Sequence, residues 1–274
     1  MKTAMLMAML TALCMMVGKA LGDNGGMMYA LVFGVIMNLY YYWNSDKMVL
    51  SQYRAQPCDR NSAPRLYAMV ERLTQRAGLP MPKVYVIPTD VPNAFATGRN
   101  PEHAAVAVNR GLMEMLSEDE LEGVLSHEIG HIKNRDILTA TIAGCMASLI
   151  TYLAQFAAFF GGRRDDREGG GGILMILLAP LAAGMIQMAI SRSREFEADK
   201  LGGEISGKPD ALADALLKIE AYAKRRIMPN ANQATAHLFI INPFSGADLK
   251  SLFSTHPSTA DRVARLREQG RSMR

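Results

Sequence analysis

Two histidines four residues apart, with a glutamate directly after the first, place the strongest constraint on what this chain can form. They lie in the segment His127-Glu128-Ile129-Gly130-His131. On an α-helix this spacing puts both imidazoles on one face, where they can bind one Zn²⁺, with Glu128 beside the water that the ion activates. The segment therefore predicts a helix that carries two metal ligands and the general base of a hydrolytic zinc site.

The residues before this motif also predict a helix. Ser117 is expected to cap its N-terminus, because Glu120 can close a capping box and the acids at 118–120 favour the positive end of the helix dipole. The apolar stripe that follows consists of Leu121, Val124 and Leu125. Gly130 costs about 1 kcal/mol relative to Ala inside a helix, which indicates that another element packs closely there.

A hydrolytic zinc site needs a third protein ligand, and the residues offer several candidates. The remaining histidines are His103, His237 and His256. None follows the pair at the spacing of a metzincin motif. Glu195 and Asp199 are four residues apart and share one helical face, so Glu195 could bind the metal while Asp199 orients a ligand histidine through its free N–H. Glu197 points elsewhere on that helix. An ordinary charged amphipathic stretch is the alternative interpretation.

Four separated motifs carry a resemblance that spans nearly the whole chain. They are NAFATG (93–98), LSHEIGH (125–131), SRSREFEAD (191–199) and STHPSTADRVARL (254–266). In this order they resemble the HtpX family of membrane-bound zinc endopeptidases, which are relatives of the CAAX prenyl proteases.

The resemblance implies both a fold and a set of site residues. It implies an α+β fold, a mainly helical gluzincin-type metalloprotease domain with a small sheet, together with transmembrane helical hairpins. It implies one Zn²⁺ per chain, bound by His127, His131 and Glu195, with Asp199 in the supporting position. His256, in the C-terminal motif, is a candidate to hydrogen-bond the developing oxyanion, with a surface histidine as the alternative.

Apolar residues make up 49% of the chain although the mean hydropathy is only +0.03, so the hydrophobicity must be concentrated in segments. The apolar segments are 4–18, 27–43, 137–160 and 172–190. The first two lie at or below the length needed to span a bilayer and flank a turn that begins at Asp23. A signal peptide is the alternative for the first run, but a second run follows at once, which favours a hairpin anchor.

We expect the chain to be organised as four consecutive parts. These are a transmembrane hairpin at 1–43, the first part of the catalytic domain at 44–136, a second apolar helical pair at 137–190 and the C-terminal part of the catalytic domain at 191–274. Within the catalytic parts we expect a helix from Pro64 to Gly78, strands at Lys83–Pro88, Ala94–Gly98 and Ala104–Asn109, a helix over Pro209–Arg226, and a helix from the cap Ser258 to Glu268.

The distribution of charge predicts where the active site lies. Residues 44–136 carry eleven Lys and Arg, which by the positive-inside rule places them in the cytoplasm. With the resemblance, this predicts a multi-pass protein of the bacterial inner membrane whose active site faces the cytoplasm. Three cysteines without paired spacing fit a reducing compartment. The net charge of +4 fits a lipid bilayer as partner, and no nucleic-acid motif accompanies it.

The predicted function is a zinc-dependent endopeptidase that cleaves misfolded or damaged membrane proteins during quality control and stress. Substrates of such enzymes bind as an added strand on a sheet edge, through main-chain hydrogen bonds that demand little of the substrate sequence. Two alternatives are a CAAX-type prenyl-protein peptidase and a non-catalytic, metal-dependent membrane scaffold. The intact Glu128 argues against the scaffold, because a structural site needs no general base.

Overall fold

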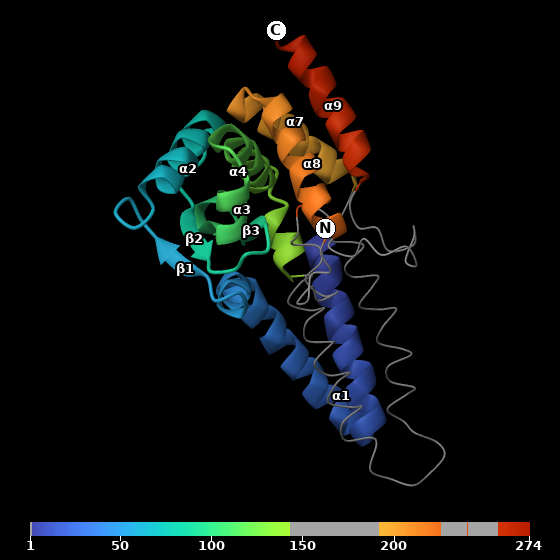
Figure 1. Ribbon diagram of the computed structural model, residues 1–274. Coiled ribbons are helices and arrows are strands. Elements are labelled where there is room, and N and C mark those ends of the chain that lie inside the picture. The colour runs from blue at the N-terminus through green and yellow to red at the C-terminus, as the bar shows by residue number, and fades with distance from the viewer. Residues whose placement is uncertain (1, 143–191, 226–239, 241–256) are drawn as a thin grey trace.

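The computed structural model describes residues 2–142, 192–225, 240 and 257–274. A long helical hairpin, α1, projects from one end of a body in which several helices gather beside a small sheet (Figure 1). The second apolar pair, expected at 137–190, falls almost wholly outside the described residues.

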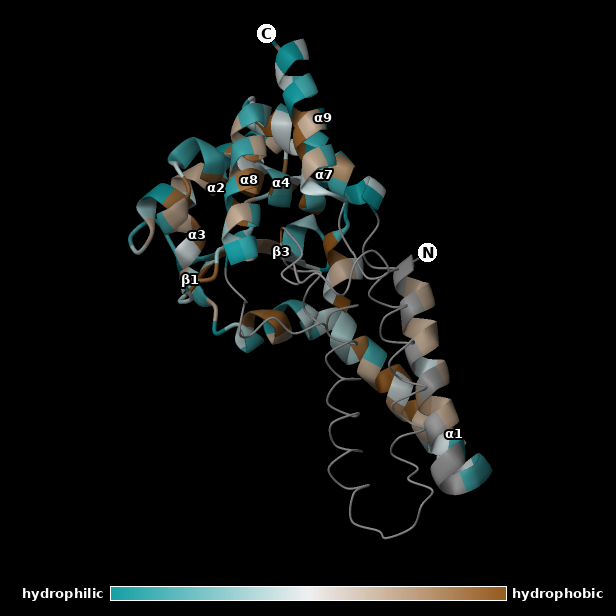
Figure 2. Cartoon of the chain, turned by 45° about the vertical axis from the view of Figure 1, so that its right-hand side comes forward, coloured by the Kyte–Doolittle hydropathy of each residue, from teal (hydrophilic) through white to brown (hydrophobic). Residues whose placement is uncertain are grey.

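Helix α1 spans Lys2–Gln52, and the chain folds back on itself near Asp23, where φ is 51°. The two arms lie side by side in both views (Figures 1 and 2). Asn38 joins them, because its Nδ2 donates to the Met7 carbonyl at 2.9 Å and to Thr11 Oγ1 at 2.8 Å. α1 continues nine residues past the domain boundary expected at 43, and its last turns pack Val49 and Leu50 into the interior.

Many residues of the α1 hairpin are hydrophobic (Figure 2). Its exposed large side chains include Met5, Met16, Met28, Tyr29, Val32, Phe33, Val35, Ile36, Leu39, Tyr40 and Trp43. Among the described residues, however, no helix combines the length and the apolar character that crossing a bilayer requires.

The sheet has four strands in the order β1-β2-β4-β3. They are β1 (Gln56–Cys58), β2 (Lys83–Ile87), β3 (Ala94–Gly98) and β4 (Ala104–Asn109). The central pair β2 and β4 is parallel, whereas β1 and β3 pair antiparallel with β2 and β4 respectively. The three predicted strands are present, β2 ending one residue early, and β1 is an addition that the sequence did not predict.

The other described helices have the following bounds. They are α2 (Pro64–Ala77), the 3₁₀-helix η1 (Pro101–His103), α3 (Arg110–Met115), α4 (Glu118–Lys133), α7 (Arg192–Ser206), α8 (Pro209–Arg225) and α9 (Thr259–Ser272). Gly78 ends α2 in the left-handed conformation, with φ at 68°, as predicted from its position. α9 runs four residues beyond its predicted end.

Helix α4 occupies the centre of the folded body and packs against α2, α7, α8 and strand β3. Its Val124, Leu125 and Ile129 have no exposed surface, and Leu212 of α8 packs directly on Gly123. Because almost every side chain of this helix is buried, its position is fixed from several sides. The His-Glu-x-x-His segment therefore sits on a helix that its neighbours hold in place from several sides.

Candidate metal centre

The start of α4 is fixed by the predicted capping box. Glu120 N–H donates to Ser117 Oγ at 3.4 Å, and Ser117 N–H donates to Glu120 Oε2 at 2.8 Å. Two backbone donors at the N-terminus of the helix are thereby satisfied. The box sets the helical register from which His127, Glu128 and His131 project.

Two glycines let α7 approach α4 closely. A Cβ on Gly130 would lie 3.1 Å from the Ala198 carbonyl oxygen, and one on Gly202 would lie 2.9 Å from the His127 nitrogen. The close neighbour predicted from Gly130 is therefore α7. This contact brings Glu195 and Asp199, both buried on α7, beside the histidines of α4.

The side chains of His127, His131 and Glu195 converge on one point. Nε2 of His127 lies 3.2 Å from Nε2 of His131 and 3.7 Å from Glu195 Oε2, and His131 Nε2 lies 3.6 Å from Glu195 Oε1. Ligands at 2.0–2.1 Å from one tetrahedral zinc ion lie about 3.3 Å from each other. The three side chains can therefore hold a metal ion with little movement, and they are the one such group among the described residues.

His127 is oriented by Asp199 on the side away from this point. Its Nδ1 lies 2.9 Å from Asp199 Oδ1, so Nδ1 carries the proton and Nε2 keeps a lone pair for a metal. Asp199 is thus paired with His127, one of the two histidines that we expect to bind the metal.

Arg262 of α9 holds Asp199 in turn. Its Nε donates to Asp199 Oδ2 and its Nη2 to Asp199 Oδ1, both at 2.7 Å. Burial alone would raise the pKa of Asp199, but the Arg262 charge and the bonds from His127 and Arg262 hold it well below its usual range. Asp199 therefore stays ionised although it is buried.

His131 is flanked by a second carboxylate, Asp136, whose Oδ2 lies 3.5 Å from its Nδ1. Burial alone would lower the pKa of His131, but Asp136 and the charges of Glu195 and Glu128 raise it to about 9. Without a metal, His131 is thus protonated at neutral pH. An incoming metal ion has to displace that proton.

Glu128 points toward strand β3. Its Oε2 accepts a hydrogen bond of 2.8 Å from the backbone N–H of Ala96, which lies in the NAFATG segment. Burial raises the pKa of Glu128 above its usual range, and the nearby His127 and His131 only partly oppose this. A carboxyl group with a raised pKa binds a proton more readily than an ordinary glutamate, as a general base requires.

The structure places the other candidates away from this cluster or outside the described residues. Glu197 is exposed, as predicted. His103 closes η1 by contacting Asn100 Oδ1 at 2.8 Å. His237 and His256 lie outside the described residues.

Sequence reasoning missed Arg262, although one signal could have found it. Arg262 shares a buried face of α9 with Leu266 and Gly270, at i, i+4 and i+8, so it stands where an apolar residue is expected. A charged residue on such a face needs a buried partner. Nothing in the sequence predicted the hydrogen bond from the Ala96 N–H to Glu128, because almost every residue type supplies a backbone N–H.

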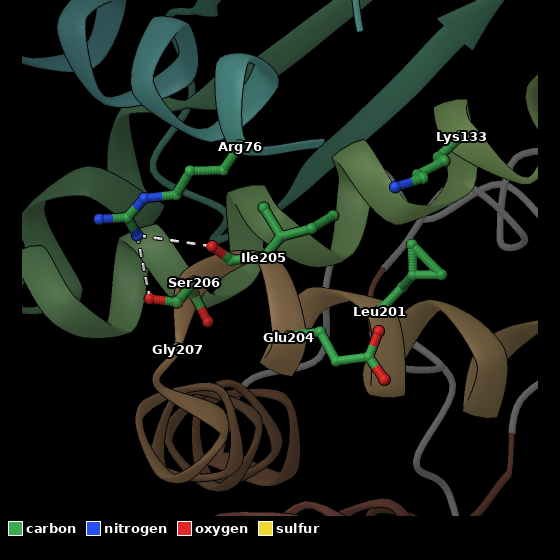
Figure 3. A pocket seen from close by; sticks show the side chains of 7 residues that line it. All are labelled: Arg76, Lys133, Leu201, Glu204, Ile205, Ser206 and Gly207. Carbon is green, nitrogen blue, oxygen red and sulfur yellow. Dashed lines mark hydrogen bonds between the residues drawn. The ribbon is translucent and has the colours of Figure 1, made fainter. Parts of the chain in front are cut away.

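A separate hollow of about 530 Å³ lies at the C-terminal end of α7 (Figure 3). Arg76 reaches into it from α2 and donates to the carbonyls of Ile205 at 3.4 Å and Ser206 at 3.1 Å. None of the metal-centre residues lines this hollow. Arg76 thus caps the end of α7, and we assign no ligand to the hollow.

Comparison with known proteins gives three findings. The model of the family described as "Peptidase family M48" matches residues 60–270 of this chain. Proteins named "Protease HtpX homolog" are 54% identical in Paraburkholderia phytofirmans, over 100% of this chain and 98% of the relative, and 56% identical in Methylibium petroleiphilum, over 97% and 96%. The crystal structure of S. mikatae Ste24p superposes with a TM-score of 0.54 at 19% identity, covering 93% of this chain and 62% of that one.

Proposed function

Since this chain belongs to peptidase family M48 and is a metallopeptidase, we propose that it is a zinc-dependent endopeptidase whose metal is bound by His127, His131 and Glu195. The observation that carries the assignment is the convergence of these three side chains on one point, next to the buried Glu128. Two imidazoles and one carboxylate are the ligand set of many hydrolytic zinc sites.

The residues around this point have separate tasks. A bound zinc ion would supply Lewis acidity and lower the pKa of a water molecule at the site to about 7. Glu128 takes the proton of the attacking water and later delivers it to the leaving amine, with its carboxylate aimed by the Ala96 N–H. Asp199 keeps His127 in the tautomer that offers Nε2. We keep His256 as a candidate donor to the oxyanion.

Polypeptides are the substrates of this proposed reaction. β3 is the end strand of the sheet and lies against α4 beside Glu128, which supports the expectation that a substrate aligns along it as an added strand. Recognition through main-chain bonds suits misfolded or damaged proteins, because it demands little of their sequence. We propose membrane proteins as this substrate class.

We propose that the α1 hairpin attaches the enzyme to the bacterial inner membrane. The exposed apolar side chains of the hairpin support this, since large exposed apolar patches mark sites of interaction with a membrane or another protein. Tyr40 and Trp43 are exposed on α1, and the Arg99 guanidinium lies 4.6 Å from the Trp43 ring, an arrangement that suits a membrane surface. The eleven Lys and Arg of residues 44–136 favour the cytoplasmic side.

The Glu128→Gln variant tests the proposed function. Glu128 is not a ligand, so the variant should retain one zinc per chain while casein cleavage falls by several orders of magnitude, because glutamine cannot accept the proton. Glu197→Gln, on an exposed position of α7, is the matched control and should cleave at the wild-type rate. Both are measured on detergent-purified protein, by metal analysis and peptide release. Undiminished cleavage by Glu128→Gln would refute the mechanism.

A further inference from the structure

Arg262 is a buried cation in the metal centre, and the reaction described above gives it no task. Only 1% of its surface is exposed. Its Nη1 lies 3.7 Å from Glu195 Oε2, and its Nη2 lies 3.5 Å from His127 Nδ1. Since Nδ1 of His127 is itself a donor to Asp199, that second approach is a contact between two donors. A positive charge this close to the proposed metal site repels the metal ion, so we expect Arg262 to make another contribution that offsets this repulsion.

Each group of nitrogen donors on Arg262 has a defined acceptor. Nε and Nη2 donate to the two oxygens of Asp199 at 2.7 Å, and Nη1 donates to the Ile240 carbonyl at 2.9 Å. Ile240 N–H in turn donates to Asn93 Oδ1 at 3.1 Å, just before β3. The guanidinium is thus fixed between α7 on one side and a peptide anchored to the sheet on the other.

This arrangement determines the position of the Asp199 carboxylate. Oδ1 of Asp199 accepts from both Arg262 and His127, whereas Oδ2 accepts from Arg262. A carboxylate with a single partner can rotate about its terminal torsion, which is a soft, roughly two-fold coordinate. The two-pronged contact with a planar guanidinium removes this freedom. His127 therefore faces an acceptor that cannot turn away.

We propose that Arg262 is a positioning residue of the metal centre, which fixes Asp199 so that His127 presents Nε2 to the metal. The inference rests on the proposed metal site, and it assigns to α9 the task of holding the Asp199 carboxylate in place. Lysine could not replace it fully, because one ammonium nitrogen cannot reach both oxygens of Asp199 and the Ile240 carbonyl in the same geometry.

The test measures zinc affinity rather than activity, on the full chain in detergent, by competition with a chelator. Arg262→Gln and Asp199→Asn should each weaken zinc binding about 10- to 100-fold, the usual effect of losing a group that orients a ligand. The double variant should bind zinc no more weakly than Asp199→Asn alone, because Arg262 acts through Asp199. Arg262→Lys should fall between wild type and Arg262→Gln.

Arg267→Gln is the matched control on the same helix. Arg267 pairs with Asp210 and Asp214, away from the metal ligands, and is only partly buried. Its replacement should leave zinc affinity at the wild-type value. A loss of zinc affinity in this variant would show that removing any arginine from α9 has a general effect.

Several outcomes would overturn the proposal. Wild-type zinc affinity in Arg262→Gln would do so, as would additive losses in the double variant, since either means that Arg262 does not act through Asp199. If Arg262→Gln does not fold, Arg262→Lys decides, and wild-type affinity in it refutes the argument. Wild-type protein that binds no zinc would instead refute the proposed function, which keeps the two failures distinct.

Discussion

The close approach of α7 to α4 at Gly202 can be tested by adding one methyl group there. A Cβ there would lie 2.9 Å from the His127 nitrogen, 3.0 Å from its Cα and 3.2 Å from the Ser126 carbonyl carbon. Ordinary contact begins at 3.4 Å. All three atoms belong to the backbone of a buried helix, so Gly202→Ala has to push His127 about 0.5 Å away from α7, since packed interiors relax only partly.

The neighbouring Gly203 provides a matched control. A Cβ on Gly203 would meet the amide end of Gln269, a flexible side chain that can swing aside. Both substitutions gain about 1 kcal/mol of helix propensity. Gly202→Ala also overpacks the interior at a cost of about 1–3 kcal/mol. The free energy of unfolding should thus be about 1–3 kcal/mol lower in Gly202→Ala than in Gly203→Ala.

The displacement should also affect metal binding. A metal site tolerates deviations of about 0.2 Å in its ligand distances, which is less than the displacement expected for His127. Zinc affinity in Gly202→Ala should fall at least about tenfold, whereas Gly203→Ala should match wild type. Chelator competition and thermal unfolding of the metal-free protein measure the two effects. Unchanged zinc affinity in Gly202→Ala would refute the claim that this contact positions the ligands.

Three further outcomes are expected. Glu195→Ala should lose both zinc and cleavage, whereas Glu197→Ala should keep both, and stoichiometric zinc in the Glu195 variant would place the third ligand elsewhere. Zinc binding should release about one proton near pH 7.5, because His131 has a pKa of about 9 and is protonated at pH 7.5. His131 loses this competing proton as the pH rises through 9, so zinc affinity should rise with pH up to about 9. Calorimetry in buffers of different ionisation enthalpy measures this release, and a buffer-independent heat would contradict it. A cysteine near Asp23 should be labelled only from outside the cell while a reporter after residue 110 is cytoplasmic, and the opposite pattern would reverse the assigned topology.

The parts of the site that sequence predicted depend on local spacing. The i, i+4 histidines, the Ser117 capping box and the Glu195–Asp199 pair each lie within one helix, where geometry follows directly from residue number. Gly130 likewise indicated a close neighbour, though only the structure identifies it as α7.

The parts that sequence did not predict depend on how distant elements dock. Arg262 is one of several arginines in α9, and its burial follows from the packing of that helix against α7, 63 residues earlier at Asp199. β1 is three residues long, with two exposed and one half-buried, so it lacks the alternation that marks a strand. The extension of α1 to Gln52 depends on burial of Val49 and Leu50 by the body of the protein.

The order of the site residues along the chain has a consequence for synthesis. The ribosome produces His127 and His131 first, Glu195 and Asp199 later, and Arg262 last. At about 5–20 residues per second, the 131 residues from Ile132 to Arg262 take about 7–26 s to make. Until Glu195 is made the emerging chain lacks the third proposed ligand, and until Arg262 is made it lacks the residue that we propose orients the centre. We therefore expect a nascent chain to remain inert toward its own unfolded segments and toward neighbouring polypeptides until Arg262 has been made.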